Sequence, residues 1–277
     1  MSKLYLVATP IGNLNDITPR AVEVLENADF IAAEDTRHTL GLLNHLGIKK
    51  PMVSYYEHNK RERGEYITER IKNGEVCALV TDAGTPAISD PGEDIVRLCA
   101  ELDIEVIPIP GACAFVQALI VSGLSTGRFS FEGFLSVNKI ARKKHLEEVS
   151  RFAQTLIFYE APHKLKATLK DLLDFLGPRK IAIVREITKI HEEVIRTNLD
   201  EAVKMYEDIT PKGEFVLVVE GYTKEDTAIE TDISEENVVR IVTELIEAGT
   251  DKKEAIKLTA HKLGIQKRTV YEYMIGK

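Results

Sequence analysis

The sequence predicts an α/β protein whose first part alternates strands and helices. Five apolar runs of strand length are separated by amphipathic segments between residues 1 and 112. Three of these runs are followed directly by loops rich in glycine and proline. Alternation of this kind is typical of a parallel sheet with helices on both faces.

The elements of the first part follow from the hydrophobic pattern and from capping residues. Strands are expected at residues 4–9, 30–34, 52–55, 76–81 and 105–110. Helices are expected at residues 18–28, 37–46, 60–72, 93–102 and 112–121. The first helix is the clearest case, because Thr18 suits an N-cap and Pro19 suits the first helical position.

The pattern changes after about residue 123. Strand-like runs such as "TLIFYE", "KIAIVREIT" and "GEFVLVVEG" follow one another with some short connections, which predicts a second α/β domain with more antiparallel pairing. The polar, acidic segment 222–237 is typical of a linker, and three short helices are expected after it. The predicted domains are therefore 1–112, 113–224, and 225–277 with the acidic linker and the helices.

Composition limits the class of protein. The 277 residues carry a net charge of −8, so no general basic surface for nucleic acid is expected. No apolar run reaches the roughly 20 residues of a membrane-spanning helix, and the N-terminus lacks the pattern of a signal peptide. The three cysteines, Cys77, Cys99 and Cys113, form no CxxC pair and favour buried thiols in a reducing cytoplasm.

Three loops after strands are candidate ligand-binding loops: "TPIGNLNDI", "TDAGTPAISDPG" and "PIPGACA". In open α/β sheets, ligands bind at the carboxyl ends of the strands, where such loops meet. The alternative is that these glycines and prolines only shape turns. The sequence contains neither a G-x-G dinucleotide motif nor a phosphate loop, so an adenosyl ligand without a phosphate tail is favoured.

Eight motifs in order carry a family resemblance. They are "LVATPIGNLNDITPRA", "AAEDTRHT", "YYEHN", "VTDAGTPAISDPG", "PIPGACA", "FEGFL", "FYEAPHKL" and "REITKIHEE". Together they resemble the small-subunit ribosomal RNA methyltransferases of the tetrapyrrole methylase superfamily. The resemblance implies two α/β domains flanking a cofactor cleft, S-adenosylmethionine as the cofactor, and a homodimer. It also implies 2′-O-methylation of a cytidine ribose in the decoding region of 16S ribosomal RNA.

The same resemblance implies a set of cofactor-binding residues. Gly84, Thr85 and Pro86 match the G-D-P of the tetrapyrrole enzymes, with threonine in place of aspartate. The expected contacts, from both domains, are Pro10, Asp82, Ala83, Gly84, Thr85, Ile88, Pro110, Gly111, Ala112, Tyr159, Glu160, Ala161 and Gly213.

The chemistry requires alignment of a methyl donor and, for a poorly nucleophilic hydroxyl, a proton acceptor. Asp35, Arg37 and His58 follow strands at the predicted sheet edge and are the catalytic candidates. A structural ion pair between Asp35 and Arg37 is an equal alternative, and Arg37 also suits a phosphate. No histidine pair has a third ligand at a usual spacing, so no metal is expected.

Two regions are candidates for RNA contact. Arg185 and Lys189 lie in "REITKIHEE", where alternating charges favour a solvated strand face or a ligand contact. Residues 250–277 carry a local excess of four positive charges on a chain that is otherwise at −12. Ala260, Gly264 and Val270 fit the spacing of a helix-turn-helix, with a generic three-helix bundle as the alternative. Lys267 and Arg268 are expected on the exposed side of its last helix.

Three functions compete on the sequence alone. The first is a ribosomal RNA ribose methyltransferase with RNA or the small ribosomal subunit as partner. The second is a methylase of corrin or porphyrin precursors, which needs no basic appendage. The third is a non-catalytic helix-turn-helix regulator that senses an adenosyl ligand.

Overall fold

We analysed a computed structural model of the chain, which describes residues 3–223, 234–247, 249–263 and 265–275. The chain divides into two compact units, Met1–Tyr222 and Thr223–Lys277, and each is described by itself. No helix within the described residues is both long enough and apolar enough to cross a membrane.

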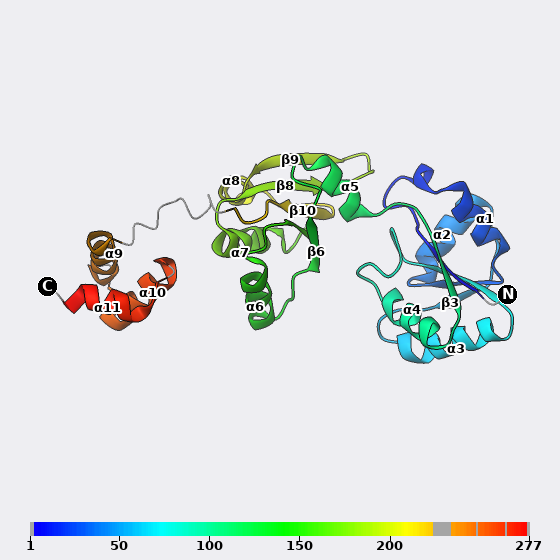
Figure 1. The fold of residues 1–277 in the computed structure, drawn as a ribbon. Helices are drawn as coiled ribbons and strands as arrows, with labels where there is room; N and C mark the ends of the chain where they lie inside the picture. The colour runs from blue at the N-terminus through cyan, green and yellow to red at the C-terminus, as the bar shows by residue number, and fades with distance from the viewer. Residues whose placement is uncertain (1–2, 224–233, 248, 264, 276–277) are drawn as a thin grey trace. The chain divides into compact units, whose positions relative to one another are not determined.

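The first unit begins with a five-stranded parallel sheet (Figure 1). Its strand order is β3-β2-β4-β1-β5. The strands are β1 (Lys3–Val7), β2 (Phe30–Ala33), β3 (Met52–Ser54), β4 (Val76–Val80) and β5 (Glu105–Ile109). All four residues of β2 and the last four of β4 are buried, as expected for parallel strands that are covered on both faces.

Helices cover both faces of this sheet. The helices of the first sheet region are α1 (Pro19–Asn27), α2 (Thr36–Leu46), α3 (Lys60–Lys72) and α4 (Gly92–Glu101), with a short 3-10 turn, η1, at Leu14–Asp16. Leu25 and Leu43 bring α1 and α2 into one core, whereas Ile67 and Ile95 bring α3 and α4 into a second. Thr18 caps α1, since its side chain accepts a hydrogen bond from the Ala21 N–H at 3.2 Å, as predicted.

The loops after β1 and β4 lie next to each other at the carboxyl edge of this sheet. These strands are neighbours, but α1 and α4, which follow them, belong to the two separate cores. Thr9 and Gly84 join the loops through two backbone hydrogen bonds of 2.9 and 3.1 Å. The hydroxyl of Thr9 also donates to the Thr81 carbonyl at 3.2 Å. A sheet edge where helices leave to opposite faces is the usual ligand position in such folds.

A second, mixed sheet completes the first unit. Its order is β6-β7-β10-β8-β9, with β10 antiparallel to both of its neighbours. The strands are β6 (Phe129–Phe134), β7 (Thr155–Glu160), β8 (Lys180–Arg185), β9 (Glu193–Asn198) and β10 (Phe215–Val219). The predicted increase in antiparallel pairing is confirmed.

Helices also cover both faces of the second sheet. α5 (Ala114–Val121) packs on one face through Ala118 and Leu119. The other face is covered by α6 (Lys139–Val149), α7 (Leu165–Leu176) and α8 (Leu199–Tyr206). These three helices are not among the predicted elements. The two-sheet α/β fold with C-terminal helices agrees with the predicted fold class.

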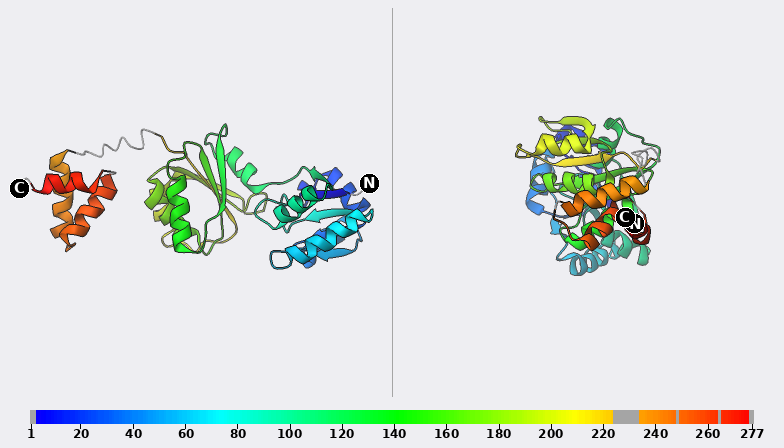
Figure 2. Two further views of the ribbon diagram at one scale, coloured as in Figure 1. Left: turned by 60° about the horizontal axis from the view of Figure 1, so that its bottom comes forward. Right: turned by 90° about the vertical axis from the view of Figure 1, so that its left-hand side faces the viewer.

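The described residues of the second unit form three helices that pack around a small core. Figure 2 shows these helices from two further directions. They are α9 (Glu235–Glu247), α10 (Lys252–Leu263) and α11 (Lys267–Ile275). Ala260 and Val270, two positions of the predicted helix-turn-helix pattern, are buried in this core. Gly264, the third position, lies outside the described residues. Lys267 and Arg268 are exposed as expected, and Arg268 pairs with Glu272 at 2.8 Å.

Close contact between the loops after β1 and β5 yields a first prediction. A Cβ placed on Gly111 would lie 2.7 Å from the Ala8 Cβ, so Gly111→Ala overpacks this contact. We expect it to lower the free energy of unfolding by about 1–3 kcal/mol. Urea titration should show this loss, whereas Gly127→Ala, with no atom within 4 Å of the new Cβ, should not lose stability. Equal stability of both variants would contradict the predicted close approach.

Candidate active site

A cavity of about 510 Å³ lies in the first unit beside the carboxyl edge of the first sheet. The loop after β4 supplies one wall, with residues from Thr81 to Asp90. The second sheet supplies the other, with Tyr159 to Pro162 at the end of β7 and just after it, and Glu214 to Val216 before and in β10. A cavity of this size, lined by apolar groups and a few polar ones, fits a small organic molecule.

The loop after β4 has a strained backbone where it lines the cavity. Gly84 has φ +88°, and two residues with side chains, Ala87 and Ser89, have φ +69° and +65°. Such angles are uncommon for residues other than glycine and persist where surrounding contacts hold them. A Cβ on Gly84 would also meet the Ile11 side chain at 3.2 Å. At Gly84 the loop therefore exposes backbone atoms to the cavity, where any residue with a side chain would crowd Ile11.

Asp90 holds the far end of this loop together. Its Oδ1 accepts hydrogen bonds from the backbone N–H groups of Ala87 and Gly92, at 3.0 and 2.7 Å. Its Oδ2 is buried and has no hydrogen-bond partner among the described residues. Burial raises the pKa of Asp90, and the backbone hydrogen bonds only partly oppose that effect.

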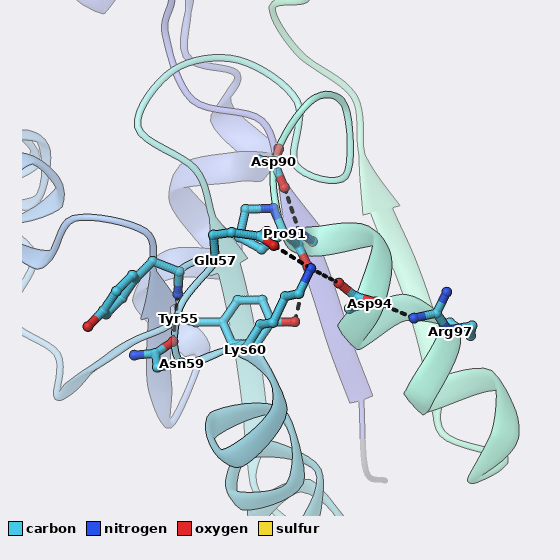
Figure 3. Close-up of polar contacts among 10 residues, drawn as sticks. Tyr55, Glu57, Asn59, Lys60, Asp90, Pro91, Asp94 and Arg97 are labelled. Carbon is cyan, nitrogen blue, oxygen red and sulfur yellow. Dashed lines mark hydrogen bonds and ion pairs between the residues drawn. The ribbon is translucent and has the colours of Figure 1, made fainter. Parts of the chain in front are cut away.

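A polar cluster contacts the residues that follow Asp90 (Figure 3). The buried Tyr55, which directly follows β3, donates its hydroxyl proton to the Pro91 carbonyl at 3.1 Å and so contacts the residue after Asp90. Lys60 forms 2.7 Å ion pairs with Glu57 and with Asp94 of α4. Hydrogen bonds to these carboxylates raise the pKa of Lys60 and keep it charged.

The second-sheet wall rests on a buried polar network. Tyr159 accepts a hydrogen bond from the Phe115 N–H at 3.2 Å, and burial raises its pKa to about 12. Both oxygens of the buried Glu160 are engaged, one by the Ala161 N–H at 2.8 Å and one by the Thr168 hydroxyl. Arg142 donates to the same hydroxyl at 2.8 Å. Glu160 therefore holds the wall in place through its hydrogen bonds, and it lines the cavity together with Tyr159 and Ala161.

Lys189 is a cation on this wall. Its ammonium group pairs with Glu186 at 2.9 Å and Glu214 at 2.8 Å. Burial alone would lower the pKa of Lys189, but the two carboxylates outweigh burial and raise it. A Cβ on Gly12 would overlap the Lys189 side chain, so the loop after β1 approaches this lysine closely.

The structure brings most predicted cofactor contacts together. The predicted cofactor contacts that line the cavity are Asp82, Ala83, Gly84, Thr85, Ile88, Tyr159, Glu160 and Ala161. The predicted cofactor contacts outside its lining are Pro10, Pro110, Gly111, Ala112 and Gly213. Of the two residues of "REITKIHEE" predicted to contact RNA, Lys189 lines the cavity and Arg185 does not. Pro10 lines a separate cavity of about 40 Å³ that shares Thr81 and Asp82 with the main one.

Some of these outlying residues support the lining instead. The Ala112 carbonyl accepts the Thr85 hydroxyl proton at 2.9 Å, and Gly213 has φ +88° beside Glu186. Arg185 donates to the Lys212 carbonyl at 2.7 Å and pairs with Glu193 at 3.4 Å.

The three catalytic candidates do not line the main cavity. Asp35 is the N-cap of α2 and accepts from the Arg37 N–H at 2.8 Å, and the two side chains form a 2.7 Å ion pair. The hydrogen bonds from Arg37 hold the pKa of Asp35 well below its usual range. His58 is exposed in the loop before α3, and its ring lies nearly perpendicular to that of Tyr56. Their catalytic roles stay predictions.

Several lining residues were not among the predicted site residues. Glu34 lines the cavity and accepts the Thr81 hydroxyl proton at 2.7 Å, although it directly precedes the candidate Asp35. Asp90 ends a loop that was predicted to hold the cofactor. Cys113 is half-buried in the lining, whereas Cys77 and Cys99 are buried as expected. Across the described part of the chain, no group of three histidine, cysteine or acidic side chains is arranged to hold a metal.

Comparison with known proteins identifies the family of this fold. The family model of the tetrapyrrole (corrin/porphyrin) methylases matches residues 3–203. The chain belongs to this family. The match includes both sheets except β10, and it ends before the second unit. The chain is therefore a methyltransferase, and the cavity is its candidate active site.

Curated relatives extend over nearly the whole chain. A protein of Synechocystis sp. named ribosomal RNA small subunit methyltransferase I is 48% identical over 273 residues, covering 98% of this chain and 97% of its own. A protein of the same name from Halalkalibacterium halodurans is 50% identical and covers 97% of this chain and 93% of its own.

Solved structures of other proteins share the fold at low identity. A uroporphyrin-III-C-methyltransferase from Thermus thermophilus has a TM-score of 0.56 at 20% identity, covering 79% of this chain and 94% of its own. A diphthine synthase has a TM-score of 0.61 at 18% identity, covering 80% of this chain and 91% of its own. At these identities the likeness establishes the fold alone.

The support behind Asp90 yields a second prediction. Tyr55→Phe removes one hydroxyl and leaves the Pro91 carbonyl without that donor. We expect a loss of about 1 kcal/mol in the free energy of unfolding, measured by urea titration. Tyr56→Phe, on an exposed ring, is the matched control and should change stability less. Equal effects of the two substitutions would mean that the Tyr55 hydrogen bond contributes nothing to stability.

Proposed function

We propose that this methyltransferase transfers the methyl group of S-adenosylmethionine to the 2′-hydroxyl of a cytidine in the decoding region of small-subunit (16S) ribosomal RNA. The observation that carries the proposal is the 48–50% identity, over 97–98% of the chain, to relatives named for this RNA. That similarity extends well beyond residue 203, where the match to the general methylase family ends.

The cavity supports S-adenosylmethionine as the donor. Its volume of about 510 Å³ suits a folded adenosyl amino acid, and it contains backbone groups around Gly84 that a phosphate-free ligand needs. Ile88, Tyr159 and Val216 offer apolar surface for an adenine ring. Acidic side chains outnumber basic ones among the described lining residues, which include one lysine, Lys189, and five carboxylates: Glu34, Asp82, Asp90, Glu160 and Glu214. That balance favours a ligand with a sulfonium and an ammonium group.

The chain's own residues have mainly an alignment task in this reaction. The donor supplies an activated methyl group, so the protein must hold it in line with the attacking oxygen and exclude competing water. The strained loop from Gly84 to Ser89 and the Tyr159 wall hold opposite sides of the cavity. Their supporting hydrogen bonds, to Ala112 and to Phe115, fix the separation of these walls before the ligand binds.

Two other functions remain as competitors. A methylase of corrin or porphyrin precursors shares the fold, but this chain is only 20% identical in sequence to the uroporphyrin-III-C-methyltransferase. An adenosyl-sensing regulator would bind the donor without transferring its methyl group. Neither explains why the relatives named for ribosomal RNA match the second unit as well.

We further propose that the enzyme acts in the cytoplasm, where ribosomes are made, and as a homodimer. Support for the dimer comes from an apolar patch on α5 and β6. Val116 and Ile120 lie on one exposed side of α5, and the exposed ring of Phe129 lies 6.2 Å from that of Phe115. Sedimentation velocity should give twice the chain mass, and a purely monomeric species would exclude the dimer.

Methylation of isolated ribosomal particles tests the proposed function. The enzyme is incubated with labelled S-adenosylmethionine and with small ribosomal subunits that lack its modification. A 2′-O-methyl group blocks attack of that oxygen on the next phosphate, so one linkage in the decoding region should become resistant to alkali. Label in a base, or label only when a porphyrin precursor replaces the subunits, would contradict the proposal.

The second unit yields a prediction about RNA binding. Lys267 and Arg268 are exposed at the start of α11, in the segment 250–277 that carries an excess of four positive charges. Replacing both with alanine should weaken binding to small subunits and flatten its salt dependence, by roughly one unit of log–log slope for each phosphate that the variant no longer neutralises. The measurement is subunit affinity over a salt series.

Donor affinity is the control for that experiment, because the cavity lies in the first unit. Calorimetry should therefore give the same S-adenosylmethionine affinity for the wild type and the double variant. A matched variant, Lys143→Ala with Lys144→Ala on exposed positions of α6, removes the same charge elsewhere. If all three proteins bind subunits with the same slope, the second unit does not contact RNA through these residues.

A further inference from the structure

We propose that Asp90 is the general base of this methyltransferase, and that its Oδ2 accepts the proton of the attacking hydroxyl. The inference rests on the proposed function, since it requires a ribose hydroxyl as the methyl acceptor. It assigns to Asp90 the role that the sequence suggested for Asp35 or His58.

The geometry of Asp90 separates its two oxygens into different tasks. Oδ1 is saturated by the N–H groups of Ala87 and Gly92, which fixes the carboxylate within the loop. Oδ2 is buried, lacks a partner in the described part of the chain, and belongs to a residue that lines the cavity. An unpaired buried oxygen is costly, so native structures usually satisfy such atoms. A hydroxyl donor in the cavity would satisfy this one.

The other acidic residues of the lining are engaged or exposed. Glu34 accepts from Thr81, and Asp82 accepts from the Asp35 N–H at 3.1 Å. Glu160 has partners on both oxygens, and Glu214 pairs with Lys189 on a side chain that is 78% exposed. Among the carboxylates that the structure describes, Asp90 alone has an oxygen that is both buried and unpaired.

The surroundings also suit a base better than those of the earlier candidates. Arg37 stabilises the charged form of Asp35, which makes Asp35 a poor proton acceptor. Burial has the opposite effect on Asp90, because it raises the pKa of the carboxyl. A raised pKa makes the carboxylate a better proton acceptor. Tyr55 and Lys60 hold the adjoining residues in place, so the carboxylate is fixed before substrate arrives.

The proposed step conserves atoms and charge. A lone pair of the 2′-oxygen forms a bond to the methyl carbon while the carbon–sulfur bond breaks, and that bonding pair remains on sulfur as a neutral thioether. The hydroxyl proton moves to Asp90 Oδ2, which becomes a neutral carboxylic acid. Water later removes this proton and restores the carboxylate for the next turnover.

Asp90→Asn tests the assignment with little change in shape. The asparagine oxygen can still accept from Ala87 and Gly92, but its amide nitrogen cannot accept a proton. We expect the single-turnover rate on small subunits to fall about 10²–10⁴-fold. Calorimetric affinity for S-adenosylhomocysteine should stay near that of the wild type. The melting temperature at about pH 8 should not fall, because the lost charge was buried without a partner.

Asp103→Asn is the matched control, since Asp103 is exposed in the turn after α4 and lies outside the cavity lining. It should keep the wild-type rate. If Asp90→Asn lowers the melting temperature, Asp90→Ser is measured instead, because a serine hydroxyl can accept from the Gly92 N–H. The loss of rate should then persist in the folded variant.

The outcomes separate the two proposals. Wild-type protein that fails to methylate RNA ends the proposed function and the base assignment together. Active wild type with equally active Asp90→Asn overturns the base assignment alone. A variant that loses donor affinity by the same factor as its rate also overturns it, because Asp90 would then be a binding residue.

Discussion

The candidate site depends on one short backbone pairing, between Thr9 and Gly84. Two hydrogen bonds of 2.9 and 3.1 Å join the loops after β1 and β4, at a sheet edge where the following helices belong to different cores. Because Gly84 has φ +88°, the loop can turn immediately after this pairing toward the cavity. The positions of Ile88 and Asp90 in the lining follow from that turn.

The second sheet complements this edge with a wall that is rigid for a different reason. The Glu160 carboxylate is buried between a backbone N–H and the Thr168 hydroxyl, and Arg142 extends the same network. Removing any one member would leave a buried polar group unsatisfied, so the network stabilises a single arrangement. One side of the cavity is therefore shaped by backbone strain and the other by a satisfied polar network.

Sequence periodicity was sufficient to predict the strands and helices of the first sheet, because buried strands and capped helices produce local sequence patterns. Periodicity was less informative for the second sheet: the predicted elements do not include α7, although Leu165, Leu169, Leu172 and Leu176 form a helical stripe. The strand-end loops were placed correctly because parallel strands share one carboxyl edge. The order of strands within the sheet, which makes β1 and β4 neighbours, is a long-range property that local patterns do not contain.

The roles of individual carboxylates could not be predicted for a related reason. Glu34 and Asp35 are adjacent in sequence, yet Glu34 lines the cavity while Asp35 caps α2 and pairs with Arg37. Which side chain points inward depends on a hydrogen bond to Thr81, a residue 47 positions away. Asp90 likewise belongs to a motif that looks like an ordinary turn, and only its buried, unpaired Oδ2 on a residue that lines the cavity distinguishes it.

A crystal structure of the wild-type protein with S-adenosylhomocysteine tests the central claim most directly. We predict that the ligand occupies the cavity between Gly84 and Tyr159, with its sulfur directed toward the Asp90 side of the lining. The loops after β1 and β4 should keep their Thr9–Gly84 pairing when the ligand is bound. Ligand bound at a different surface, with this cavity empty, would contradict the account.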